Sequence, residues 1–422
     1  MKFIQKLLAQ LSYGLLLVTC VLFSFHLNAQ NNDEIVSYIE YKGKVIDKNS
    51  EDGIASTHLK VKNSTLSTIT NNEGEFSLKV PKENLDLVVS VYVLGYETKN
   101  IHLDYFNRDY TTIALEITTE KLSEVELFSA VDAKKIVKQT LENKGDNYLN
   151  EPILLTGFYR ESIQQRNKHV SLSEAVVNIE KQPYNSKRED RVSLFKARKS
   201  SDYNNLDTLA VKLKGGPFGP LYVDIMKYPD FLFYNSTVEG FKFTFDEPTK
   251  FEDRYLYVIN FEEINTSQPW YFGKLYIDAK TLTLVKADYS LNVDNRRAAM
   301  NMFVRKKPGS AKVFPIETAY QIDYSEENRK WYYSYSSAYM KFVVNWKNKL
   351  FNSRYDFNSE MIITNRKPHE ENWKKTNNLI RPSIVMVDDV SGFYDKDFWG
   401  ENNIIEPNKT IEEAIEKIKE KI

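Results

Sequence analysis

Short runs of alternating apolar and polar residues, separated by clusters of turn-forming residues, recur along most of this chain of 422 residues. Alternation with a period of two is typical of strands that bury one face of a sheet. Aromatic residues make up 13% of the chain, whereas it contains only 15 Gly. Because bulky, ring-bearing side chains pack well on a pleated surface, this composition favours sheets over helix bundles. The sequence therefore predicts a mainly β fold.

The charges of the chain nearly cancel, since 57 Lys and Arg stand against 58 Asp and Glu. Binding to the phosphate backbone of nucleic acids depends on basic side chains in excess. The densest basic run, residues 187–199, also contains acidic residues, so we interpret it as solvated surface, with contact to anionic lipid headgroups as the alternative. We expect no nucleic-acid partner.

The first 29 residues have the pattern of a secretory signal peptide. Two lysines precede an almost wholly apolar run from Leu11 to Leu27, and Ala29 before Gln30 fits a cleavage site. The sequence predicts export, with a mature chain that starts at Gln30 and is periplasmic or associated with the outer membrane. An uncleaved anchor helix and a lipoprotein modified at Cys20 are the alternatives. No later run reaches about 18 apolar residues, so we expect no transmembrane helix in the mature chain.

Four motifs between residues 39 and 118 lie in a region with six or seven short predicted strands, which is typical of a small β-sandwich. They are Gly43–Asp47, Gly53–Ala55, Thr70–Leu78 and Val89–Glu97. In this order they resemble the carboxypeptidase-D regulatory-like domain. In Bacteroidetes that module precedes many TonB-dependent outer-membrane receptors and other exported proteins, and in the carboxypeptidases it is a non-catalytic accessory. The resemblance implies a TonB-dependent receptor as a partner.

Gly74 lies in a predicted turn within the motif Thr70–Leu78. Gly74 follows three turn-forming residues, so we expect it to adopt a positive φ in a tight hairpin, with Asn71 or Asn72 bonding to the local backbone. The alternative is a calcium loop, but the segment offers only the carboxylates of Glu73 and Glu75. We therefore expect a structural turn and no metal.

Beyond the module, an amphipathic helix is predicted from Val131 to Tyr148, followed by long antiparallel strands. The clearest meander comprises residues 255–261, 270–277 and 283–291. The predicted divisions are a signal peptide (1–29), an N-terminal linker (30–38), a regulatory-like β-sandwich (39–118), a connector (119–129), an antiparallel half-barrel-like domain (130–400) and a C-terminal helix (401–422).

Two segments of the larger domain resemble known families. Leu154–Glu161 after the helix, together with Asp397–Gly400, resembles a group of Bacteroidetes exported proteins of unassigned function. Gly273–Asp278 within the meander is similar to a hairpin of the periplasmic lipoprotein carriers, whose fold is an open half-barrel of antiparallel strands around a helix and a hydrophobic cavity. This second resemblance implies a curved sheet that holds a lipid or a lipoprotein ligand.

Sequence motifs for catalysis are absent. The chain has neither H-E-x-x-H nor G-x-S-x-G, and its single cysteine, Cys20, lies in the predicted signal peptide. The Gly-rich stretch 215–220 contains two prolines that each remove a backbone donor, so we interpret it as a rigid loop before a strand-like segment, 221–223. Adjacent acids such as Glu262 and Glu263 point to opposite faces of a strand. We expect no cofactor and no enzyme activity.

The candidate ligand-binding residues are Arg160, Glu174, Tyr159, Trp331 and Tyr333. Alternation places Arg160 on the same strand face as Phe158, and Glu174 falls near the opposing position of the next strand. This pair is either an internal ion pair or an anchor for an anionic headgroup at a cavity rim. The aromatic strand 331–339 either fills core or lines a pocket for lipid or sugar.

The leading hypothesis is a non-catalytic exported envelope protein that binds a hydrophobic or amphiphilic ligand or an outer-membrane partner. The alternatives are a structural accessory module of a TonB-dependent receptor or surface assembly, and a glycan-active hydrolase. A wide apolar cavity inside the large sheet favours the first, a packed core the second, and two facing carboxylates in a cleft the third.

Overall fold

The computed structural model describes residues 38–82, 87–118, 132–166, 168–201, 215–233, 237–267, 269–303, 310–347, 351–369, 379–386 and 398–419. The predicted signal peptide, nearly all of the N-terminal linker and the connector 119–129 lie outside these residues, as does the predicted cleavage before Gln30.

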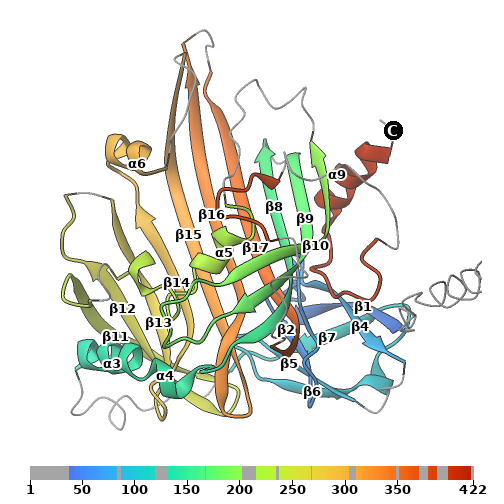
Figure 1. The fold of residues 1–422 in the computed structure, drawn as a ribbon. Helices are drawn as coiled ribbons and strands as arrows, with labels where there is room; N and C mark the ends of the chain where they lie inside the picture. The colour runs from blue at the N-terminus through green and yellow to red at the C-terminus, as the bar shows by residue number, and fades with distance from the viewer. Residues whose placement is uncertain are drawn as a thin grey trace, which may run out of the picture. The chain divides into compact units, whose positions relative to one another are not determined.

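The N-terminal module consists of two small sheets (Figure 1). One has the order β4-β1-β7 and the other β3-β2-β5-β6. Their bounds are β1 Tyr38–Asp47, β2 His58–Val61, β3 Ser67–Ile69, β4 Glu75–Pro81, β5 Val88–Tyr92, β6 Lys99–His102 and β7 Thr111–Leu115, with a short 3-10 helix at Leu103–Tyr105. Residues of both sheets, among them Val45, Phe76 and Val91, share one buried core. The predicted β-sandwich is confirmed.

The turn at Gly74 has the predicted conformation. Gly74 has a φ of 81°, and a Cβ added there would lie 2.5 Å from the carbonyl oxygen of Val45. The Oδ1 atom of Asn71 accepts hydrogen bonds from the backbone N–H groups of Glu73 and Glu75, both at 2.9 Å. Both the positive φ and the close approach of the backbone therefore require glycine.

Ten antiparallel strands form the large sheet, in the order β10-β9-β8-β17-β16-β15-β14-β13-β12-β11. Their bounds are β8 Ile153–Gln165, β9 Lys168–Lys181, β10 Arg191–Ser201, β11 Phe241–Phe251, β12 Arg254–Glu263, β13 Trp270–Asp278, β14 Leu284–Asn292, β15 Ala311–Glu327, β16 Lys330–Trp346 and β17 Ser353–Pro368. The strands β10 and β11 end the order without pairing with each other, so the sheet is not closed into a barrel. The predicted meander corresponds to β12, β13 and β14, and the mainly β fold with a large open antiparallel sheet is confirmed.

Helices are short. They are α3 Ala133–Glu142, α4 Lys144–Asn147, α5 Phe218–Tyr222, the 3-10 turn η2 Pro229–Phe231, α6 Arg296–Phe303 and α9 Lys409–Lys419. The segment 221–223, predicted as strand-like, instead completes and follows α5. Pro217 has a helical φ of −58°, which suits the start of a helix, and Phe218 and Leu221 are both buried at helical spacing.

One face of the large sheet is covered by α3, by α5 and by the segment that follows α5, and it is filled with side chains. Figure 1 shows α5 over β16 and β17, and α3 lies against β11. The segment 215–233 covers this face, and we call it the covering segment. Its residues Leu221, Met226 and Phe233 are buried together with sheet residues such as Ile259 and Ile322. We call this the packed face.

The opposite face is partly covered by the N-terminal module and by the C-terminal segment 398–419. Imidazole Nε2 of His58 lies 3.2 Å from Oδ2 of Asp323, and Oγ1 of Thr68 donates to the carbonyl of Ile404 at 3.0 Å. A buried apolar cluster joins the three parts: Ile69, Phe158, Val176, Tyr335, Ile362, Trp399, Ile404 and Ile405. The uncovered remainder of this face, which we call the open face, holds the cavities described next.

Candidate functional site

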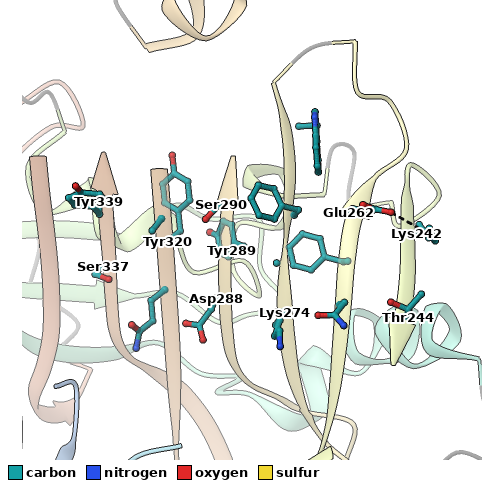
Figure 2. A pocket seen from close by; sticks show the side chains of 17 residues that line it. Lys242, Thr244, Glu262, Lys274, Asp288, Tyr289, Ser290, Tyr320, Ser337 and Tyr339 are labelled. Carbon is teal, nitrogen blue, oxygen red and sulfur yellow. Dashed lines mark hydrogen bonds and ion pairs between the residues drawn. The ribbon is translucent and has the colours of Figure 1, made fainter. Parts of the chain in front are cut away.

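A cavity of ≈ 670 Å³, cavity 1, lies on the open face over β11 to β16 (Figure 2). The cavity forms where alternate side chains of neighbouring strands point to the open face of the sheet. On β13, Phe272 and Lys274 are exposed, whereas Tyr271 and Leu275 are buried. Phe272 is 39% exposed, and its ring centroid lies 5.2 Å from that of Trp270. Cavity 1 therefore has an aromatic patch within a polar surface.

The charged residues that line cavity 1 have partners of opposite sign. The Nζ atom of Lys242 lies 3.3 Å from Glu262, and that of Lys274 lies 2.7 Å from Asp246. Figure 2 shows the Lys242–Glu262 contact and the side chains of neighbouring strands beside it. Asp288 lies 3.1 Å from Lys286, and burial raises the pKa of its carboxyl. The cavity thus shows no strong excess of either charge.

A second cavity of ≈ 310 Å³, cavity 2, adjoins the first on the same face. Gln321, Ser337 and Tyr339 line both cavities. Cavity 2 is also lined by residues of the module, such as Asn72, and by residues at the start of α9, such as Asn408. All three parts of the protein therefore contribute to one polar depression.

Arg160, which lines cavity 2, forms an ion pair with the fully buried Glu174. They are directly paired across β8 and β9, with Nε of Arg160 donating to Oε1 of Glu174 at 2.8 Å. The Arg198 Nε donates to the other carboxylate oxygen at 2.6 Å, and Nη2 of Arg160 donates to the Ile405 carbonyl at 2.8 Å. Burial acts to raise the pKa of Glu174, but the two guanidinium groups outweigh it and lower that pKa. The internal pair foreseen from strand alternation is present.

Among the acidic and histidine side chains that line cavity 2, those of Glu360 and His169 have shifted pKa values. Burial raises the pKa of Glu360, whose Oε1 lies 3.7 Å from Nη1 of Arg160. Burial and the charge of Arg160 lower the pKa of His169 to about 4, so its imidazole is neutral at pH 7. Arg160 itself, whose side chain is only 3% exposed, lines cavity 2 while held by protein partners.

The other three sequence candidates lie on the packed face. Tyr159 is buried and donates to Oε2 of Glu161 at 2.6 Å, and the Tyr333 hydroxyl lies 2.7 Å from that of Ser336. Trp331 is buried with the Arg254 guanidinium 5.2 Å from its ring. The structure therefore brings Arg160 and Glu174 together and separates them from these aromatic residues.

Cavity 1 was not anticipated from the sequence. The available signal was an exposed phenylalanine, Phe272, on the polar side of a strand whose other side is apolar. Such a residue stands out only when the buried side of the strand is known.

A third cavity, of ≈ 900 Å³, lies between the module and the ends of β11, β12 and β13. It is lined by residues of both parts, including Ser90, Thr98 and Arg254. Within the described ranges, no three His, Cys, Asp or Glu side chains are grouped as ligands of a metal ion. In the same residues, no helix is long and apolar enough to span a bilayer.

Comparison with known proteins identifies the N-terminal module. Residues 41–127 match the CarboxypepD_reg-like domain. The resemblance stated for the four motifs is thereby confirmed for this part of the chain. A search of curated protein sequences returned no match.

Solved structures similar to this chain include the proteins that the meander was expected to resemble. A putative outer membrane lipoprotein-sorting protein domain from Vibrio parahaemolyticus is 11% identical, covering 57% of this chain and 96% of its own, with a TM-score of 0.24. A LolA superfamily protein from Nitrosomonas europaea is also 11% identical, covering 59% and 99%, with a TM-score of 0.22. The MucA/MucB complex of Pseudomonas aeruginosa matches at 10% identity, 57% and 100% coverage, and a TM-score of 0.18.

Proposed function

We propose that this protein is a non-catalytic envelope protein that binds an amphiphilic ligand on the open face of its large sheet. Cavity 1 carries this proposal, because its volume of ≈ 670 Å³ falls within the usual range for ligand pockets. It combines the exposed ring of Phe272 with hydrogen-bonding side chains from neighbouring strands. An apolar surface flanked by polar groups is the arrangement that suits an amphiphilic molecule.

The packed face argues against a purely hydrophobic ligand inside the sheet. Leu221, Met226 and Phe233 belong to a packed core on this face, and a packed core is the feature that favours the accessory alternative there. Removing such side chains from a close-packed core is costly, so a ligand would have to displace well-packed groups there. The open face requires no such rearrangement.

The charge pairs of cavity 1 support binding rather than catalysis. Glycoside hydrolysis requires one carboxyl as a proton donor and another as a nucleophile or base. In cavity 1 the acids Glu262 and Asp288 each lie beside a lysine, Lys242 and Lys286. Both carboxylates are thus engaged by cations, which does not match a free acid–base couple. The location in the envelope follows from the expected signal peptide and belongs to the same proposal.

Native mass spectrometry of protein purified from its own envelope tests the proposal. We expect the wild-type protein to carry a bound mass that Phe272→Asp loses, because a charge in the aromatic patch opposes burial of apolar ligand surface. The control is Phe351→Asp, which changes a phenylalanine that is 81% exposed and does not line cavity 1. A wild-type protein without bound mass, or one whose bound mass survives Phe272→Asp, would favour the accessory alternative.

A further inference from the structure

Cavity 2 is lined mainly by neutral hydrogen-bonding groups. Eleven of its sixteen lining residues are Ser, Asn, Gln or Tyr. Ser162 and Asn358 are directly paired across β8 and β17 and share the open face. Ser162 is 5% exposed, and among the described residues neither side chain has a hydrogen-bond partner. Ser162 is buried and Asn358 is half-buried in the wall of cavity 2, so their polar atoms are available to a ligand.

The charges around cavity 2 are already compensated. Arg160 is engaged by Glu174 and the Ile405 carbonyl, and Asp356 lies 3.3 Å from Lys341. His169 is neutral because burial lowers its pKa to about 4. An anionic or cationic ligand would need an unpaired counter-charge, which these groups do not supply. The chemistry of the cavity therefore favours a neutral ligand with many hydroxyl groups.

Cavity 1 provides the complementary apolar surface. The exposed face of Phe272, beside Trp270, can pack against the C–H face of a sugar ring while Ser290 and Gln321 reach its hydroxyl groups. Because Gln321, Ser337 and Tyr339 line both cavities, a chain of several sugar units can extend from one into the other.

Two other ligand classes fit less well. A lipid acyl chain needs a continuous apolar wall, whereas the wall of cavity 2 consists of amides and hydroxyls. A peptide that adds to a sheet needs a free strand edge, but β12 to β16 are paired on both sides beneath the cavities. We infer that the ligand is a neutral oligosaccharide bound along cavities 1 and 2. This inference rests on the proposed function, since it names the ligand class of the same face.

Calorimetric titration of the full mature chain with neutral oligosaccharides of increasing length, such as gluco-, manno- and xylo-oligosaccharides, tests the inference. We expect one series to bind, with affinity that rises with chain length as cavity 2 is reached. Phe272→Ala and Asn358→Ala should each weaken binding by about tenfold or more, because each removes a central contact. Phe351→Ala should leave binding unchanged. Ser162→Ala supplies a second variant for cavity 2, and thermal melting verifies that each variant is folded.

The inference is overturned if no neutral series binds, or if binding is insensitive to both Phe272→Ala and Asn358→Ala. It is also overturned if acidic oligosaccharides, peptides or phospholipid vesicles bind through these residues instead. A bound mass that depends on Phe272 but is not a carbohydrate leaves the proposed function intact and removes only the inference. The absence of any Phe272-dependent bound mass removes both.

Discussion

The Nζ atom of Lys181 lies 2.6 Å from Oδ2 of Asp224 and 2.8 Å from Oδ2 of Asp190, with all three side chains buried. Lys181 ends β9, whereas Asp224 belongs to the segment that covers the packed face. The Tyr324 hydroxyl donates to the second oxygen of Asp224 at 2.8 Å. This cluster fixes the covering segment to the sheet by charge and hydrogen bonding as well as by apolar packing.

Lys181→Met tests the importance of this cluster. The substitution keeps the length of the side chain but leaves two carboxylates buried without their cation, which should lower the free energy of unfolding by about 3–5 kcal/mol. Urea denaturation monitored by tryptophan fluorescence measures the change. The matched control is Lys187→Met, because Lys187 is exposed and should alter stability by less than about 0.5 kcal/mol. Equal stability of the two variants would contradict a structural role for the cluster.

Arg160→Met separates the two roles considered for Arg160. Arg160 is the partner of buried Glu174 and of the Ile405 carbonyl, and Arg198 also pairs with Glu174. The substitution should therefore lower the free energy of unfolding by about 3 kcal/mol. Thermal and urea denaturation check this. A variant that melts like the wild-type protein but loses its bound mass would assign Arg160 to ligand binding instead.

Local patterns in the sequence were sufficient for part of this architecture. Strand alternation placed Phe158 and Arg160 on one face, and the guanidinium indeed lies 5.2 Å from the Phe158 ring. The pair with Glu174 followed from the same rule, because β8 and β9 form a hairpin whose register depends on neighbouring residues.

Other features depend on contacts between distant segments and could not be predicted this way. The strand β8 pairs with β17 as well as with β9, which brings Glu360 opposite Arg160. Alternation along β16 also cannot tell which face is covered, so the sequence alone leaves Trp331 and Tyr333 either in the core or in a pocket. Both residues are buried in the core that also contains the segment around α5, which was expected to precede a strand.

Glu161→Gln should change how stability depends on pH. Burial raises the pKa of Glu161 to about 7, against an ordinary value of about 4.3. Between these two values the folded state holds a proton that the unfolded state has lost, so wild-type stability should fall as pH rises through this window, by about 3–4 kcal/mol in total. Glutamine can accept the Tyr159 hydrogen bond without a charge. The variant should therefore be more stable than wild type at pH 8, measured by urea denaturation.

Glu151→Gln is the control for this experiment, because Glu151 is exposed. It should retain the wild-type decline in stability between about pH 4 and 7. If Glu161→Gln declines in the same way, another group is responsible for the pH dependence.

The attachment of the N-terminal module can be tested by cutting the chain. A protease site engineered between Thr118 and Asp132 should yield two fragments that stay together during size-exclusion chromatography. The reason is the buried contact between them, which includes His58 with Asp323 and the cluster around Ile69. Burial acts to raise the pKa of Asp323, but Lys286 and His58 outweigh it and lower that pKa to about 2.

The pKa of Asp323 in the folded protein lies below its ordinary value of about 3.9. The contribution of Asp323 to the stability of the folded, associated protein is therefore complete above about pH 3.9 and is lost as the pH falls through about 2. The cut protein should therefore remain associated at pH 7 and separate more readily towards pH 2. Asp323→Asn should weaken association at pH 7 and reduce this acid sensitivity, whereas Asp52→Asn, at an exposed position in the module, should do neither. Fragments that separate at pH 7 without any substitution would show that the module is an independent domain, as the charged connector 119–129 first suggested.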